Sequence, residues 1–277
     1  MILPIVLDTC TIFNILRIDN EDEFLYKKLK GLNLHISDYV YNEAQRNINY
    51  KPFLKEQKDY ITQQLPSFAK HIVSPDEKIK TDFFDSLKKF CNYIKEDGEL
   101  HSTLLSLYIC RKEGTRLFFY TDDFPAKKQF DPYFSYQQIG TIGDSVDLLL
   151  FLFWSVSDFK EKQLKDYLQS LRSEYAIPLR NFSKEIELKK DLWLNSKPRD
   201  KKLRENLHKI ETGGINLEFD ILNEGINFFR RNKSQYKAIN DIIKKYPDID
   251  TETELTVKIN YVMKKLNRNF KICKCLC

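Results

Sequence analysis

The sequence predicts an α/β domain built on a parallel sheet, followed by an all-helical region. Short apolar runs typical of strands alternate with stretches of helical spacing through residues 1–155. Strands that alternate with helices form βαβ crossovers, and these give a parallel sheet. From about residue 158 onward the strand signals fade, and the amphipathic stretches that follow predict helices. We therefore expect a first domain at 1–155 and a helical, basic region at 156–277.

The first two predicted strands each lead into a helix. The apolar run at 2–7 stops at Asp8, and helical spacing follows at 9–16. A second short strand at 32–37 precedes a helical stretch at 39–47. This order of strand and helix is the one that a βαβ unit requires.

The remaining elements of the first domain continue the alternation. Polar helical segments fill most of 50–95, and a helix with one apolar face opens at Gly98. The third predicted strand is 116–120 and the fourth is 135–139. An apolar helix at 144–157 completes the predicted domain.

Charge is distributed unevenly between the two regions. Residues 1–155 contain 19 Lys and Arg against 22 Asp and Glu, a net charge of −3. Residues 156–277 contain 26 against 18, a net charge of +8. This asymmetry is typical of a protein that holds a cation with one part and a polyanion with the other. For any single lysine cluster, a solvated helix surface is the simpler explanation.

Neither a membrane span nor a secretion signal is evident. No stretch approaches the roughly 18 to 20 apolar residues that cross a bilayer, and the amino-terminal run lacks a basic region and a small-residue cleavage site. We therefore expect a cytoplasmic protein without a membrane partner. The six cysteines fit neither a secreted disulfide framework nor paired zinc motifs, and we expect the closing Cys273, Cys275 and Cys277 to be reduced thiols in a frayed tail.

Acidic residues follow two predicted strands and lie on two predicted helices. Asp8 and the pair Asp122 and Asp123 come directly after apolar runs, so their carboxylates converge if those strands are neighbours. Glu43 and Glu99 are supplied by helices. Each acid alone could be a helix cap, a dipole partner, a solvated residue or part of a turn. The four positions in this order are harder to obtain from capping alone, and together they predict a site.

This arrangement resembles the PIN domain over residues 2–155. The resemblance implies a three-layer α/β/α nuclease fold in which such acids bind Mg²⁺ or Mn²⁺ and phosphodiester bonds, usually of RNA, are hydrolysed. It makes Asp8 the central metal ligand, with Glu99 and either Asp122 or Asp123 completing the set, and Glu43 binding directly or through water. The residues that carry it are Ile5 to Thr9, Ile36 to Asp38 with Glu43, Asp97 to Leu100, Phe118 to Asp123, and Ile139 to Thr141.

The chemistry of these residues agrees with that expectation. Hard divalent cations take oxygen ligands, and Mg²⁺ uses one or two carboxylates with water and substrate phosphate. The four histidines form no ligand set of the zinc hydrolase kind. As substrate-binding candidates near the expected crevice we name Thr9, Thr103, Arg116, Lys127 and Lys128.

Two features depart from the small toxin-type members of that family. The spacing from Glu43 to Glu99 is generous, and the chain continues for 122 residues beyond residue 155. The added helical region could hold RNA, bind an inhibitory or activating protein, or form a homo-oligomer. Its basic clusters at 199–204, 230–233 and 264–271 are further candidates for gripping nucleic acid.

Three hypotheses therefore stand. The first is a metal-dependent endoribonuclease, acting as a toxin or an antiphage-defence effector. The second is a DNA nuclease with the same metal site. The third is a non-catalytic PIN-like module that binds RNA or protein, and it predicts no metal binding at Asp8 and Glu99.

Overall fold

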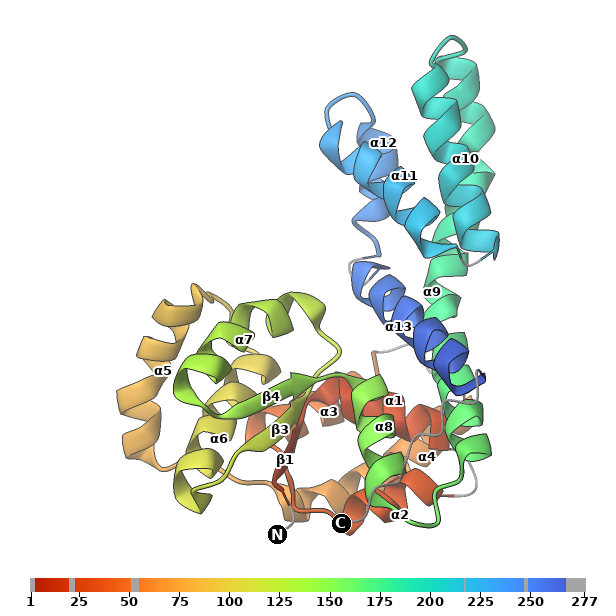
Figure 1. Cartoon of the computed structure of the whole chain (residues 1–277). Helices are drawn as coiled ribbons and strands as arrows, with labels where there is room; N and C mark the ends of the chain where they lie inside the picture. The colour runs from red at the N-terminus through yellow and green to blue at the C-terminus, as the bar shows by residue number, and fades with distance from the viewer. Residues whose placement is uncertain (1–2, 20–22, 51–54, 217, 247–248, 268–277) are drawn as a thin grey trace. The chain divides into compact units, whose positions relative to one another are not determined.

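The structure is a computed structural model that describes residues 3–19, 23–50, 55–216, 218–246 and 249–267 (Figure 1). Its described residues form two compact units, at 3–167 (unit 1) and 168–267 (unit 2). The sequence places a boundary after residue 155, whereas the units divide within α9 (Glu161–Ser196), because this continuous helix contributes to both. Each unit is described by itself.

Unit 1 contains a sheet of four parallel strands. The strands are β1 (Ile5–Leu7), β2 (Leu34–His35), β3 (Leu117–Tyr120) and β4 (Gly140–Gly143), in the order β2-β1-β3-β4. All three pairings are parallel. The three residues of β1 are wholly buried, as expected for a central strand covered on both faces. The predicted parallel sheet is therefore confirmed.

Helices cover both faces of this sheet (Figure 1). On one face, Val6, Phe119 and Ile142 belong to one buried cluster with residues of α6 (Gly98–Glu113) and α7 (Phe124–Gln137). On the other face, the ring of Phe118 lies 5.4 Å from that of Phe151 in α8 (Ser145–Ser155). Alternating strand side chains thus pack into two separate helical layers.

The other helices of unit 1 join these strands. The helices predicted after the first two strands and at Gly98 are all present, whereas α2 (Phe24–Lys30) and α7 are helices that the sequence did not predict. The remaining bounds are α1 (Thr9–Asp19), α3 (Asp38–Asn47), α4 (Lys55–Gln64), the 3-10 helix η2 (Leu65–His71) and α5 (Glu77–Cys91).

The fourth strand lies later in the chain than the sequence predicts. Residues 135–137 belong to α7, which buries Phe130, Tyr133 and Phe134 with the i, i+3, i+4 spacing of a helix. The strand itself is Gly140–Gly143, a run with too little apolar character to be recognised as a strand. At Gly140, with φ +152°, a Cβ atom would lie 1.8 Å from the carbonyl oxygen of Leu117, so the strand pairing requires glycine here.

Unit 2 is all-helical, as the sequence predicts. It consists of the rest of α9 with α10 (Lys201–Asn216), α11 (Phe219–Arg231), α12 (Lys237–Ile243) and α13 (Ile249–Asn267). Its core contains apolar side chains from α9 to α12. The three cysteines at 273, 275 and 277 lie outside the described residues. Among the helices of the described ranges, none is long and apolar enough to cross a membrane.

Candidate metal centre

Asp8 lies at the carboxyl end of β1 and is 2% exposed. Its backbone N–H donates to the carbonyl of Tyr120 (3.1 Å), so it extends the pairing of β1 with β3. Its Oδ2 accepts hydrogen bonds from the thiol of Cys10 (3.0 Å) and the hydroxyl of Thr121 (3.3 Å). Its Oδ1 is buried and accepts no hydrogen bond from the residues that the structure describes. A buried carboxylate oxygen without a partner is costly, so it marks a position suited to a cation.

Glu43 and Asp8 meet at the backbone of Gly98. Glu43 lies on α3, and its Oε2 accepts a hydrogen bond from Thr9 Oγ1 at 2.7 Å. A Cβ atom at Gly98 would lie 2.8 Å from both Glu43 Oε2 and Asp8 Oδ1. Because both oxygens lie 2.8 Å from that single point, they are at most 5.6 Å apart. Glycine at this position therefore leaves the space in which two carboxylates from different elements approach each other.

Glu99 lies in the first turn of α6, close to the same group of acids. The helix begins after Asp97, whose carboxylate accepts hydrogen bonds from Leu100 N (3.3 Å) and from the hydroxyl of Tyr93 (2.6 Å). Burial is the largest cause that raises the pKa of Glu99 to about 10, and the negative charges of Asp8, Asp97 and Asp123 act in the same direction. Glu99 is therefore held where its ionised form is disfavoured unless a positive charge is present.

The pKa of Asp8 is raised as well. Burial is the largest cause that raises its pKa to about 6, and the charge of Glu43 adds to it, although the hydrogen bond from Cys10 opposes the shift. Acids with raised pKa values that repel one another are characteristic of functional sites. We call Asp8, Glu43, Glu99 and Asp123 the carboxylate cluster.

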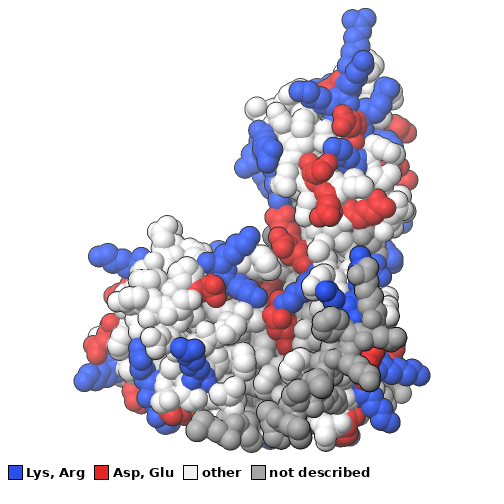
Figure 2. All heavy atoms as spheres, in the orientation of Figure 1, with Lys and Arg blue, Asp and Glu red and all other residues white. Residues whose placement is uncertain are grey.

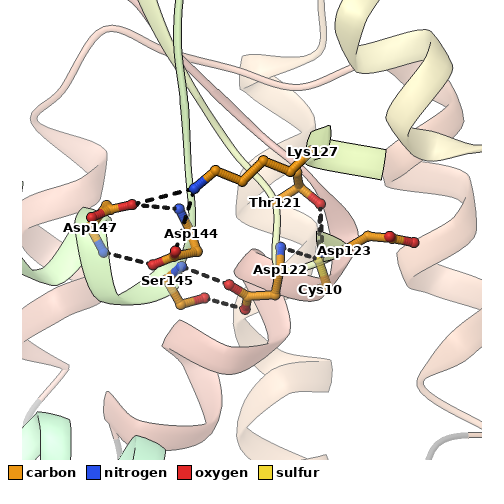
Figure 3. A network of polar contacts seen from close by, with 8 residues as sticks. All are labelled: Cys10, Thr121, Asp122, Asp123, Lys127, Asp144, Ser145 and Asp147. Atoms are coloured by element: carbon orange, nitrogen blue, oxygen red, sulfur yellow. Dashed lines mark hydrogen bonds and ion pairs between the residues drawn. The ribbon is translucent and has the colours of Figure 1, made fainter. Parts of the chain in front are cut away.

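Asp122 and Asp123 point in opposite directions (Figure 3). Asp122 is 5% exposed, and its oxygens accept hydrogen bonds from Ser145 N (2.7 Å), Ser145 Oγ (2.5 Å) and Asn14 Nδ2 (2.5 Å). It therefore ties the end of β3 to the beginning of α8. Asp123 caps α7 by accepting a hydrogen bond from Ala126 N (2.8 Å), and its charge acts on Glu99. Of the adjacent pair, the structure brings Asp123 to the cluster.

Asp144 is an acid at the same sheet edge that the sequence argument missed. It directly follows β4, is 2% exposed, and forms a capping box with Asp147 at the beginning of α8. The ammonium of Lys127 lies 3.6 Å from Asp144 and 3.9 Å from Asp147 (Figure 3). The signal was an aspartate after a strand, and placing the fourth strand too early concealed it. Lys127 thus neutralises a second pair of acids at this edge.

The other residues predicted to bind substrate lie in different parts of unit 1. Thr9 supports Glu43, and Thr103 is fully buried on α6. Lys128 is exposed, with its ammonium 4.9 Å from the ring centre of Phe124. Arg116 precedes β3, so it lies at the opposite edge of the sheet, whereas the sequence analysis expected it near the crevice.

The donor set suits a hard cation, although the side chains are not closed around one. Among the described residues, no three Asp, Glu, His or Cys side chains come together as they stand to hold one metal ion. The acids of the carboxylate cluster offer only oxygen ligands, the kind that Mg²⁺ and Mn²⁺ prefer. The unpartnered Asp8 Oδ1 and the raised pKa values of Asp8 and Glu99 show that positive charge would be favourable there. The cluster therefore fits a divalent ion in charge and ligand type.

Comparison with models of protein families, with curated proteins and with solved structures finds no match to this chain. Its function must therefore be argued from the chemistry and geometry of the site.

Proposed function

We propose that this chain is a divalent-metal-dependent endoribonuclease whose carboxylate cluster binds Mg²⁺ or Mn²⁺. The observation that carries the proposal is the buried, unpartnered Asp8 Oδ1, which lies against the Gly98 backbone together with Glu43 Oε2. Bound there, a divalent ion would lower the pKa of a water molecule and offset negative charge on a phosphate.

The chain's own residues have distinct parts in this proposal. Asp8 would be the central ligand, Glu43 and Glu99 would approach it from two helices, and Asp123 would complete the set. Thr9 would orient Glu43 through the hydrogen bond that it already donates. We do not assign Asp122 to the ligand set, because its oxygens accept three hydrogen bonds that connect β3, α1 and α8.

The resemblance to PIN domains supports both the nuclease activity and RNA as its substrate. A four-stranded parallel sheet with helices on both faces is compatible with a three-layer PIN-like fold. The acids reach the carboxyl edge of this sheet, where ligands bind in open parallel sheets. Within that proposal, a role in toxicity or antiphage defence, under the control of a partner protein or a trigger, remains our expectation.

We further expect a single divalent ion. Lys127 already supplies positive charge to Asp144 and Asp147, and Asp122 is held by its hydrogen bonds. The acids that remain available as metal ligands therefore form a single group, the one around Asp8.

The decisive experiment is cleavage of single-stranded RNA and DNA by the purified chain with Mn²⁺, Mg²⁺ or EDTA. We expect RNA cleavage with either ion, none in EDTA, and a loss of at least about 100-fold in Asp8→Asn, since removal of a central charge-stabilising group costs that much. The matched control is Asp82→Asn, which makes the same change at an exposed position of α5. Cleavage of DNA but not RNA would favour a DNA nuclease with the same site.

A second candidate is a non-catalytic PIN-like module, and one observation favours it. The described side chains do not form a ready three-ligand set. This candidate predicts that calorimetry detects no Mn²⁺ binding and that neither nucleic acid is cleaved. Mn²⁺ binding that disappears in Asp8→Asn would exclude it.

A further inference from the structure

The hairpin of α9 and α10 in unit 2 contains a groove that the metal centre does not explain. The groove has a volume of about 470 Å³. We call it the hairpin groove; it is lined by Lys190, Leu194, Lys201, Arg204, Glu205 and His208. Lys190 and Leu194 come from α9 and the other four from α10, so two helices form opposite walls.

Positive charge in this hairpin exceeds what its own acids can neutralise. Residues 197–208 contain five Lys and Arg but only two Asp and Glu. Asp200 is occupied by hydrogen bonds from Leu203 N (2.9 Å) and the hydroxyl of Tyr236 (2.8 Å), and Glu205 lies 3.7 Å from Lys209. A surplus of cations therefore remains around the turn, where Figure 2 shows Lys and Arg side chains at the end of unit 2.

Lys201 and Arg204 belong to this surplus. Both are exposed, and within the described part of the chain neither forms an ion pair or a side-chain hydrogen bond. They also lie in the first turn of α10, which has no acidic residue. Because the amino end of a helix carries partial positive charge, cations are unfavourable there and an anion is favourable. Apart from Asp200, which precedes the helix and accepts the hydrogen bond from Leu203 N, no acid of the described residues offsets these two cations at the start of α10.

The two cations and a histidine form a row along the groove. Lys201, Arg204 and His208 are spaced i, i+3 and i+7, so they share one face of α10. At 1.5 Å per residue, their successive positions lie about 4.5 and 6 Å apart along the axis. Lys190 adds a positive charge on the opposite wall of the groove, and this charge is paired with Glu211. A row of charges suits a linear polyanion better than a single small anion.

We infer that the hairpin groove binds the phosphodiester backbone of a single nucleic acid strand. Phosphate contacts of this kind give affinity without reading the base sequence. The apolar side chain of Leu194 offers a sugar or base a surface within the same groove. This binding needs no metal ion, so it stands independently of the proposed cleavage.

The test measures binding of the full chain to a fluorescently labelled single-stranded RNA by anisotropy in EDTA, where no metal-dependent cleavage occurs. The test variant is Lys201→Gln with Arg204→Gln, and the control is Lys237→Gln with Lys244→Gln, which removes the same charge from the first residue of α12 and from its C-cap. Thermal unfolding of both variants verifies that the fold is retained, as expected for exposed side chains.

Salt dependence provides the quantitative result. Each phosphate contact contributes about −0.7 to the slope of log K against log salt for single strands, so we expect a slope shallower by about 1.4 in the test variant. We also expect about tenfold weaker binding at about 0.1 M salt, with little change in the control. Equal effects of the two double variants would overturn the inference. Equal competition by polyglutamate and by unlabelled RNA would overturn it too, because the groove would then suit an acidic protein.

Discussion

Asp8 combines two properties that are unfavourable in a purely structural residue. It is buried at a strand end, and one of its oxygens lacks a hydrogen bond from the described residues while other acids lie nearby. A structural aspartate of this protein, Asp122, is also buried, but hydrogen bonds satisfy both of its oxygens. The comparison separates a carboxylate that connects elements from one that is suited to a ligand.

The first prediction concerns Gly98, which leaves room for two carboxylate oxygens. In Gly98→Ala, the new Cβ would lie 2.8 Å from Asp8 Oδ1 and Glu43 Oε2, so both must move. We expect Mn²⁺ affinity to fall by about tenfold or more, as for other changes that disturb ligand orientation. Calorimetry measures the affinity. The control is Gly31→Ala, where the new Cβ would lie 3.5 Å from the nearest atom, and an equal loss there would contradict the prediction.

The second prediction separates the two adjacent aspartates. Asp122→Asn places an amide donor against the donors of Ser145 and Asn14, so we expect the free energy of unfolding to fall by about 1 to 3 kcal/mol. Asp123→Asn preserves a good helix cap and should change stability by less than about 0.5 kcal/mol. It should instead weaken Mn²⁺ binding. Urea unfolding and calorimetry on both variants test this, and the reverse pattern would assign the ligand to Asp122.

At the scale of elements, α7 and α8 determine which acids remain for a metal ion. Asp123 is the N-cap of α7 and Lys127 is the fourth residue of that helix, and α8 begins with the capping box of Asp144 and Asp147. Lys127 reaches both members of that box. The start of α7 therefore supplies both Asp123 to the carboxylate cluster and the cation of Lys127 to Asp144 and Asp147.

The third prediction follows from this position of Lys127. In Lys127→Met, a cation is removed from beside two acids, one of them 2% exposed, so the carboxyl edge gains uncompensated negative charge. We expect calorimetry with Mn²⁺ to give one ion per wild-type chain and a second, weaker ion in the variant. Lys128→Met is the control because Lys128 is exposed. Two ions in the wild type would contradict the single-ion expectation, whereas no ion at all would contradict the metal centre itself.

For the whole molecule, the cluster makes stability depend on pH when no cation is bound. The pKa of Asp8 is raised from 3.8 to about 6 and that of Glu99 from 4.5 to about 10. A carboxyl with a raised folded-state pKa holds its proton more tightly in the folded chain. Its stabilising contribution is therefore present below the unfolded-state pKa and is lost as pH rises through the folded-state pKa.

The fourth prediction uses that dependence. In EDTA, we expect the free energy of unfolding to decline from about pH 5 to about pH 10, because the folded-state pKa values of Asp8, about 6, and of Glu99, about 10, lie in this range. The decline should be smaller in Asp8→Asn with Glu99→Gln, and Mn²⁺ should oppose it only in the wild type. Urea unfolding at several pH values measures this. An unchanged decline in the double variant would show that other groups cause it.

The sequence by itself determined the alternation of strands and helices, the all-helical second region and the acids at strand ends. These features are local, because hydrophobic periodicity and the residue that follows a strand can be read along the chain. The strand at Gly140–Gly143 could not be found this way, since its position depends on pairing with β3 rather than on its own apolar character. The helix at Phe124–Gln137 was missed for the related reason that its end was taken for that strand.

Only the tertiary structure decided which acids meet. Asp122 and Asp123 are equivalent in sequence, but the carboxylate of Asp122 is hydrogen-bonded to residues 14 and 145, whereas the charge of Asp123 acts on Glu99. The need for glycine at position 98 likewise depends on the tertiary structure, because Asp8 and Glu43, which are distant in sequence, both lie against its backbone. Side-chain direction and long-range neighbours are set by packing, whereas the sequence order fixes only the edge of the sheet at which a residue arrives.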